Sequence, residues 1–325
     1  MKKSACGSGL ARYISTQSCS YLGQARSHNE KFTTSEPGSG AANYVSVIGA
    51  EFLSLIDRIG RRVRIPAVRG LMIPVVGEQR GKDAEFCALE LDDGAVGLSY
   101  VWLGGTLAAL QDEPFGTALA GMDGRALAAW YGDPDEAKRT LGFAAINAIS
   151  QSFFRQIGYR PDTAADSIGL IEPAATDHIG MIGLFPPLVD RILASGARLT
   201  VAELNPRFVT ENERYRVTLD PMMLAVCNKV VTTSTVLLND TLDAVLQACC
   251  NATYFGIIGP TAGCVPDPLF ARGVDTLGGT RVTDLEGFRA AMARGEPWGR
   301  TTQKYCIRRH TYPGLDALLA RRDRG

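Results

Sequence analysis

Apolar residues along the chain follow a helical period in some segments and alternate with polar residues in others. At 47–60 they recur about every 3.6 residues, which predicts a helix. The segments 85–91 and 95–102 alternate on either side of an Asp-Asp-Gly turn sequence, which predicts an antiparallel hairpin. A longer helical pattern covers 136–157 and stops at a glycine. Residues 43–158 are therefore expected to form an α+β domain.

The pattern changes at residue 178, where short apolar strands begin to alternate with amphipathic helices. This alternation predicts a parallel sheet covered by helices, as in a Rossmann-like domain. We expect this second domain at 178–296. Residues 159–177 hold two prolines and little periodicity, and they are predicted to link the domains. The predicted fold class is α/β.

Both ends of the chain are predicted to lie outside these domains. Residues 1–42 are rich in serine, glycine and threonine and lack apolar periodicity, which is typical of a flexible tail. Residues 297–325 carry seven Lys or Arg against two Asp and are predicted to be a basic tail with a short helix at 314–322. A solvated surface explains this basicity better than an anion-binding patch.

Composition narrows the classes of partner. Lys plus Arg and Asp plus Glu both number 34, so no net field attracts nucleic acid or an anionic membrane. No apolar stretch reaches the roughly 20 residues that span a bilayer. The eight cysteines form no CxxC pair, so a reducing cytoplasm is the expected location. We expect a small-molecule or metal ligand as partner, and a homo-oligomer is left open.

Candidate binding residues follow the predicted parallel strands, because open α/β sheets bind ligands beyond the carboxyl ends of their strands. Glycines there allow close backbone approach, a proline at a helix start exposes free N–H groups, and hydroxyls suit a polar ligand. The candidates are Gly183, Phe185, Glu203, Thr232, Thr233, Ser234, Asn239, Gly259, Pro260 and Thr261.

Glu203 allows three interpretations. It lies twenty positions beyond Gly183, the spacing at which the acidic residue of a Rossmann sheet meets a ribose hydroxyl. It is equally a candidate metal ligand, or simply a solvated carboxylate at a strand end. The sequence around Gly183 departs from GxGxxG, which disfavours a dinucleotide.

Catalytic signatures are weak. The three histidines, His28, His178 and His310, show no Ser/His/Asp or Cys/His arrangement. The vicinal pair Cys249 and Cys250 has no zinc-ligand partner nearby, so core thiols are the favoured interpretation. Whether the protein is an enzyme is left open.

Several segments resemble the family described as putative heavy-metal chelation proteins. In the second half they are DHIGMIGLFPPLVDRI at 177–192, VVTTSTVLLNDTLDAVL at 230–246 and GIIGPTAGCVPDPLFARGVDTLGGTRVTD at 256–284. In the first half they are GLSYVW at 97–102 and LGFAAINA at 141–148. The resemblance implies an enolase N-terminal-like domain followed by a Rossmann-like domain, with a ligand cleft between them. It adds Tyr100 and Asn147 to the candidate site.

Two functions follow from these observations. The first is a binding protein that holds a divalent or heavy metal ion, or its complex with an organic molecule, in the interdomain cleft. Glu203 and the hydroxyls after residue 231 would supply oxygen ligands, and loop N–H groups would hold an anionic chelator. The alternative is an enzyme with a nucleotide-like cofactor, such as an S-adenosylmethionine-type transferase or a lyase, with Glu203 on the ribose.

Overall fold

The computed structural model describes residues 46–75, 85–112, 115–164 and 171–322, which contain two β-sheets. The predicted flexible tail at 1–42 lies outside the described residues. The described chain mixes helices with parallel and antiparallel strands, so the predicted α/β class is confirmed.

The first sheet is antiparallel and has the order β1-β2-β3. Its strands are β1 (Val68–Met72), β2 (Phe86–Leu91) and β3 (Val96–Tyr100), and the predicted hairpin joins β2 to β3. Alternate residues of β2 and β3 face opposite sides of this sheet, and both sides are buried. Each face therefore needs a covering layer.

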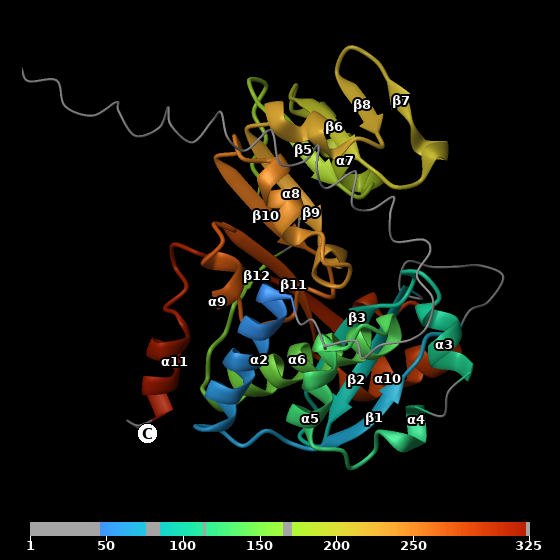
Figure 1. Ribbon diagram of the computed structural model, residues 1–325, viewed down its shortest axis with the longest axis vertical. Coiled ribbons are helices and arrows are strands. Elements are labelled where there is room, and N and C mark those ends of the chain that lie inside the picture. Colours follow the sequence, from blue (N-terminus) through green and yellow to red (C-terminus); the bar gives the residue numbers. More distant parts are fainter. Residues whose placement is uncertain (1–45, 76–84, 113–114, 165–170, 323–325) are drawn as a thin grey trace, which may run out of the picture. The chain divides into compact units, whose positions relative to one another are not determined.

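Two helices from distant parts of the sequence cover the two faces (Figure 1). Helix α6 (Glu136–Gln156) packs against β3 and β2, and it is buried on almost every side. Helix α10 (Leu285–Arg294) covers the other face, where Phe288 packs with Leu98 of β3. The helix that we had assigned to the second predicted domain thus completes the core of the first.

The second sheet has nine strands in the order β4-β12-β11-β10-β9-β5-β6-β8-β7. Its six central strands are parallel: β5 (His178–Ile182), β6 (Arg198–Ala202), β8 (Tyr215–Thr218), β9 (Lys229–Thr233), β10 (Tyr254–Ile258) and β11 (Thr276–Val282). Numbered along the chain, these strands lie in the spatial order 3-2-1-4-5-6, which is the order of dinucleotide-binding sheets. The predicted parallel sheet is present.

Antiparallel strands extend both edges of this sheet. Strand β12 (Thr302–Arg308) pairs with β11 along its whole length, β4 (Asp162–Thr163) pairs with β12, and β7 (Thr210–Glu211) pairs with β8. The prediction of a basic tail at 297–325 was wrong for β12. There the basic residues flank a buried apolar triplet, Tyr305-Cys306-Ile307. The burial of these three side chains stabilises the strand within the sheet.

The remaining elements are short connections and covering helices. They are α2 (Val47–Gly60), α3 (Thr106–Asp112), α4 (Phe115–Ala118), α5 (Gly124–Ala128), α7 (Pro186–Ala194), α8 (Leu242–Ala248), α9 (Asp267–Phe270) and α11 (Leu315–Arg322), with 3-10 turns at 129–132, 206–208, 221–226, 234–237 and 299–301. The helix predicted at 314–322 is α11. None of the described helices combines the length and apolar composition that crossing a bilayer requires.

One hydrophobic core joins the first sheet to the second. It contains Phe52 of α2, Phe143 of α6, Ile257 of β10 and Tyr305 of β12, all nearly inaccessible to solvent. Since these residues come from both predicted domains, the halves of the chain bury apolar surface together. The linker at 159–177 and the likeness of the first sheet to enolase N-terminal domains stay predictions.

Candidate functional site

The ends of β5 and β9 form the switch point of the parallel sheet. These two strands are neighbours in the sheet. The parallel strands that follow β5 in the chain lie on one side of this pair, and those that follow β9 lie on the other. Loops that follow neighbouring strands of this kind diverge and leave an opening at the carboxyl edge. Five of the twelve predicted site residues define this place, which we call the strand-end site: Gly183, Glu203, Thr233, Ser234 and Gly259.

Gly183 and Thr233 bring the ends of β5 and β9 into contact. Gly183 has a φ of +80°, a left-handed conformation that glycine adopts without strain. A Cβ atom at this position would lie 3.3 Å from Cγ2 of Thr233. The Oγ1 of Thr233 accepts a hydrogen bond from the Thr235 hydroxyl at 3.3 Å, so two hydroxyls meet just beyond the strand.

Gly259 and Ser234 join the ends of β10 and β9 in the same way. Gly259 has a φ of +137°, and a Cβ atom there would lie only 2.4 Å from Oγ of Ser234. No larger residue fits without displacing that hydroxyl. The two glycines therefore keep the backbone of three strand ends close together and free of side-chain bulk.

Glu203 follows β6 and turns its carboxylate onto the loop after β5. Its Oε2 accepts a hydrogen bond from the Leu184 N–H at 2.9 Å. Its Oε1 accepts from the Leu204 N–H at 2.9 Å and the Asn205 N–H at 3.4 Å. Charge-assisted bonds of this kind fix the carboxylate, so Glu203 is more than a solvated strand-end residue.

The start of helix α7 offers an anion fewer free N–H groups than expected. Pro186 and Pro187 have no N–H group, and the N–H groups of Leu188 and Val189 donate to the Phe185 carbonyl at 2.8 Å and 3.0 Å. The Leu184 N–H is already bonded to Glu203. The two prolines and the protein's own carboxylate thus remove several of the expected donors, and the prediction that this loop holds an anionic chelator stays a prediction.

Tyr100 connects the first sheet to this edge. Its N–H donates to Oγ1 of Thr261 at 3.0 Å, which places the end of β3 beside the loop after β10. Burial, followed by the negative charges of Glu85 and Glu203, raises the pKa of Tyr100 to about 12. The phenol is therefore protonated at neutral pH and lies in a negative local potential. Sequence reasoning missed Glu85, which precedes β2 and carries no motif.

Comparison with known proteins matches this arrangement to one family. Two family models, both described as "Putative heavy-metal chelation", match residues 84–150 and 166–310. The chain belongs to this family. The first match covers β2, β3 and most of α6, and the second covers the parallel sheet, so the resemblance seen in the sequence is confirmed.

Individual known proteins resemble this chain in sequence or in fold. An uncharacterised protein of Methanocaldococcus jannaschii is 31% identical over 156 residues, which make up 47% of this chain and 58% of that protein. A family protein of unknown function from Pyrococcus horikoshii has a TM-score of 0.55, and one from Desulfitobacterium hafniense has 0.58. Each is 20% identical and matches 80% of this chain and 98% of its own. That identity shows a common fold alone.

Three of the predicted ligand residues are buried inside the protein instead. The Thr232 hydroxyl is inaccessible and donates to the Thr233 carbonyl at 3.2 Å. Asn147 is also inaccessible, and its Nδ2 donates to the carbonyls of Leu98 and Thr261 at 2.8 Å each. Thr261 is held by Tyr100 and Asn147. Asn147 and Thr261 thus position the loop after β10, and the Thr232 hydroxyl bonds locally at the end of β9.

The other predicted residues lie near the surface without a shared partner. Asn239 is half-buried, and its Oδ1 accepts from the Thr241 hydroxyl at 2.6 Å, which is a local turn contact. Pro260 is half-buried beside Gly259, and the ring of Phe185 lies 3.8 Å from the position of a Gly183 Cβ atom. Phe185 and Pro260 thus border the strand-end site, and Asn239 belongs to the start of α8.

The donor atoms at this edge are oxygens, which suit hard and borderline divalent cations. Among the described residues no three His, Cys, Asp or Glu side chains cluster as a metal site would require. Cys264 is fully buried, and burial raises its pKa to about 12, so it stays a thiol. Oxygen ligands for a metal would thus come from Glu203, the hydroxyls, and a bound organic molecule.

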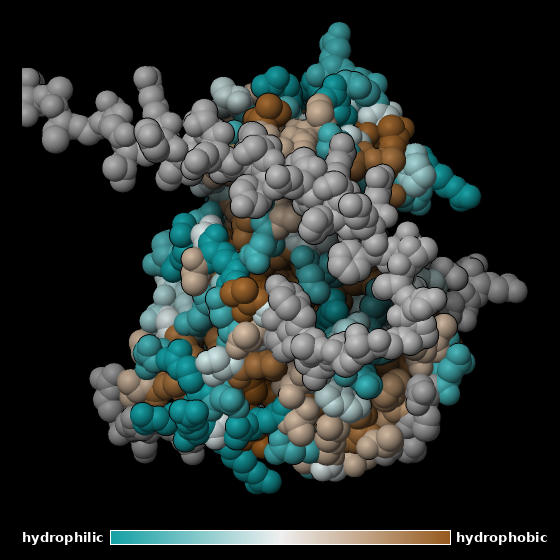
Figure 2. Space-filling model, in the orientation of Figure 1, coloured by the Kyte–Doolittle hydropathy of each residue, from teal (hydrophilic) through white to brown (hydrophobic). Residues whose placement is uncertain are grey.

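Exposed apolar side chains border Glu203 on one side. Leu204 is 85% exposed, and Phe208, Val209 and Leu219 are about half exposed, all in the loops that follow β6 and β8. Figure 2 shows hydrophobic surface in this part of the molecule. Exposed apolar groups gathered at one place commonly mark a ligand or partner surface.

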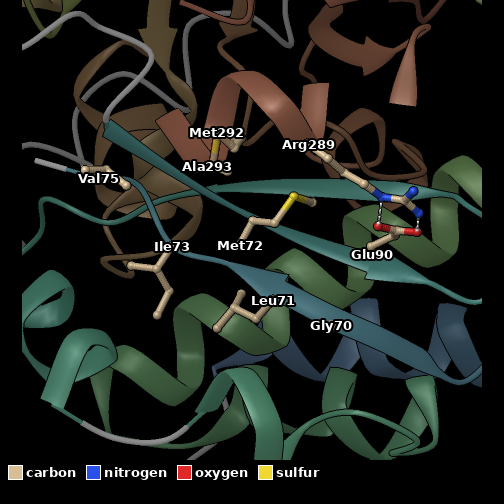
Figure 3. A pocket seen from close by; sticks show the side chains of 9 residues that line it. All are labelled: Gly70, Leu71, Met72, Ile73, Val75, Glu90, Arg289, Met292 and Ala293. Atoms are coloured by element: carbon tan, nitrogen blue, oxygen red, sulfur yellow. Dashed lines mark hydrogen bonds and ion pairs between the residues drawn. The ribbon is translucent and has the colours of Figure 1, made fainter. Parts of the chain in front are cut away.

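A separate hollow of about 330 Å³ lies between β1 and α10 (Figure 3). Its walls are apolar except for Glu90 and Arg289, which point toward each other and form two hydrogen bonds. Arg69 adds a contact to Glu90 at 3.3 Å. Because Glu90 satisfies the guanidinium of Arg289, this hollow offers a ligand little beyond apolar contact.

Proposed function

We propose that this protein binds a divalent metal ion carried by a small organic molecule, and that the complex occupies the strand-end site. The observation that supports this most is the Glu203 carboxylate, which three backbone N–H groups hold at the switch point of the parallel sheet. A carboxylate has about four acceptor positions, so one stays available to a cation.

The charge at this edge favours a cation over an anion. Glu203 and Glu85 both raise the pKa of Tyr100, so their negative potential reaches the end of β3. The N–H groups of Leu184, Leu188 and Val189, which could have attracted an anion, are already bonded within the protein. This negative potential repels an anion, but it does not repel a cationic or neutral metal complex.

The organic part of the ligand is supported by the mixed chemistry of the surroundings. Hydroxyls of Thr233 and Thr235 and the Tyr100 phenol can exchange hydrogen bonds with ligand oxygens. The apolar side chains of Leu204 and Leu219 can cover carbon atoms on the other side. Ligand sites commonly combine apolar walls with a few fixed polar groups in this way.

Metal binding to a matched pair of variants tests the proposal. The protein, Glu203→Gln and Glu213→Gln would be dialysed against Mn²⁺, Ni²⁺, Zn²⁺ or Cd²⁺ with and without citrate, and bound metal measured by mass spectrometry. Glu213 is an exposed carboxylate in the turn before β8, at the amino-terminal end of this parallel strand and so away from the strand-end site. We expect Glu203→Gln to weaken binding roughly tenfold and Glu213→Gln to leave it unchanged.

The same samples separate the alternative function. The topology and the place of Glu203 after the second parallel strand also suit an enzyme with an adenosine cofactor. A thermal shift with S-adenosylmethionine and none with metal would support that enzyme. Metal at background levels for all four ions, with and without citrate, would contradict the binding proposal. We further propose a reducing compartment such as the cytoplasm, since Cys87, Cys227 and Cys249 are free thiols.

A further inference from the structure

A cavity of about 260 Å³ lies at the end of helix α6, between the β2–β3 turn and the end of β11. It shares no residue with the strand-end site. Among the described residues, its lining includes three arginines, Arg155, Arg160 and Arg281, and no carboxylate. Arg155 and Arg160 lie five residues apart, but Arg281 is distant in the sequence, so no single motif contains all three.

Two of the three guanidinium groups have no carboxylate partner among the described residues. Arg155 is paired with Asp93 and also donates to the Asp93 carbonyl at 2.8 Å. Arg281 donates from Nε to the neutral Oε1 of Gln303 at 3.1 Å. Arg160 is exposed and forms no hydrogen bond or ion pair with any other described residue. The cavity therefore keeps a net positive charge.

Neighbouring negative groups do not cancel this charge. Asp162, two residues beyond Arg160, is paired with Arg308 at 2.8 Å. Helix α6 ends here, and a helix end contributes about half a negative charge from its free carbonyls. Two of those carbonyls are bonded, because the Tyr159 N–H donates to the Phe154 carbonyl at 2.9 Å and the Gly158 N–H donates to the Arg155 carbonyl at 3.2 Å, which leaves a partial charge smaller than that of the arginines.

Aromatic side chains form part of the wall. The rings of Phe154 and Tyr159 lie 5.1 Å apart between their centroids. Burial, followed by the charge of Asp162, raises the pKa of Tyr159 to about 12, so its phenol is a neutral hydrogen-bond donor. The cavity is slightly smaller than the usual site for a drug-sized ligand, which limits it to a compact molecule.

The geometry points to a second binding site in this cavity, one that takes a small organic anion whose carboxylate or phosphate oxygens contact Arg160 and Arg281. Guanidinium groups bind both kinds of oxyanion through paired N–H donors. The rings of Phe154 and Tyr159 contact the carbon part. This inference does not depend on the metal proposal, because the two sites share no residue.

Calorimetric titration of the full chain with inorganic phosphate and with citrate, in low-chloride buffer, tests the site. We expect one saturable site for at least one of the two probes, and the tighter probe assigns phosphate or carboxylate chemistry. Arg160→Gln and Arg281→Gln should each raise the Kd roughly tenfold. Arg61→Gln, which neutralises an exposed arginine that does not line the cavity, should leave the Kd unchanged.

Two results would overturn the inference. One is the absence of saturable binding with both probes. The other is equal weakening by Arg160→Gln and Arg61→Gln, which would mean that the anion responds only to net charge. Arg160 is exposed, so its variant should fold even if Arg281→Gln disturbs the end of β11. Raising the salt concentration should weaken specific binding, since added anions compete for the guanidinium groups.

Discussion

Asn147 in the middle of α6 donates a hydrogen bond from Nδ2 to the Thr261 carbonyl at 2.8 Å, so a buried helix side chain holds the loop after β10. The same nitrogen donates to the Leu98 carbonyl on β3. One amide group therefore connects α6, the first sheet and the loop beside the strand-end site. Its role is to position that loop.

Replacing Asn147 with alanine should destabilise the protein by about 2–4 kcal/mol, because two buried carbonyls lose their donor and a small cavity forms. Urea unfolding followed by circular dichroism measures this change. The control is Gln156→Ala on the same helix, whose exposed amide donates to the Arg64 carbonyl. Equal effects of the two substitutions would contradict the positioning role.

Gly259→Ala should destabilise the protein by about 2–4 kcal/mol, from a strained φ and from the clash with the Ser234 hydroxyl. Adding Ser234→Ala should recover part of the loss, because it removes the atom at 2.4 Å and leaves the next side-chain atom at 3.4 Å. Thermal melting of the two single variants and the double variant gives the coupling. Additive effects would show that the two residues do not interact.

The fold could be predicted from the sequence where one element carries its own signal. The hairpin β2–β3 has alternating residues around a turn, and the parallel strands are apolar runs followed by helices. Strand β12 was missed because its basic residues resemble a solvated tail, and its burial depends on pairing with β11. Helix α10 packs on the first sheet through a tertiary contact, and the hydrophobic periodicity of a single segment cannot predict such a contact.

The candidate site could be predicted only in part for a similar reason. Strand order placed Gly183, Glu203 and Gly259 at one edge, as the rule for parallel sheets implies. The direction of each side chain depends on its neighbours, so the inward burial of Thr232 was not predictable. Neither was the hydrogen bond that the Leu184 N–H donates to Glu203, which depends on how two loops pack.

Glu90→Gln should destabilise the protein by about 2 kcal/mol, since it removes a buried charge that pairs with Arg289 and Arg69. The value is below that of a fully buried pair because the side chain of Arg289 is 41% exposed and water can solvate it. Urea unfolding at low and high salt measures the effect. Asp316→Asn, which breaks an exposed pair with Arg58, should change stability less.

The ion pair between Asp177 and Lys229 lies where the parallel strands β5 and β9 begin, and it predicts a pH dependence of stability. Burial alone would raise the pKa of Asp177, but hydrogen bonds from Lys229, Asn228 and the Ala174 N–H lower it below its usual value. A carboxyl whose pKa is lower in the folded state stabilises the fold above its unfolded pKa of about 3.9. That contribution disappears as the pH falls through the folded pKa.

Asp177→Asn should therefore cost stability at pH 7, by about 1–3 kcal/mol, and the cost should shrink as the pH falls below about 4, where the native carboxyl also becomes neutral. Urea unfolding of both proteins at pH 7, 5 and 3 measures the difference. At pH 5 the cost should still be nearly complete, because the unfolded carboxyl is already mostly ionised there. A cost that is the same at pH 7 and pH 3 would show that Asp177 acts through packing rather than charge.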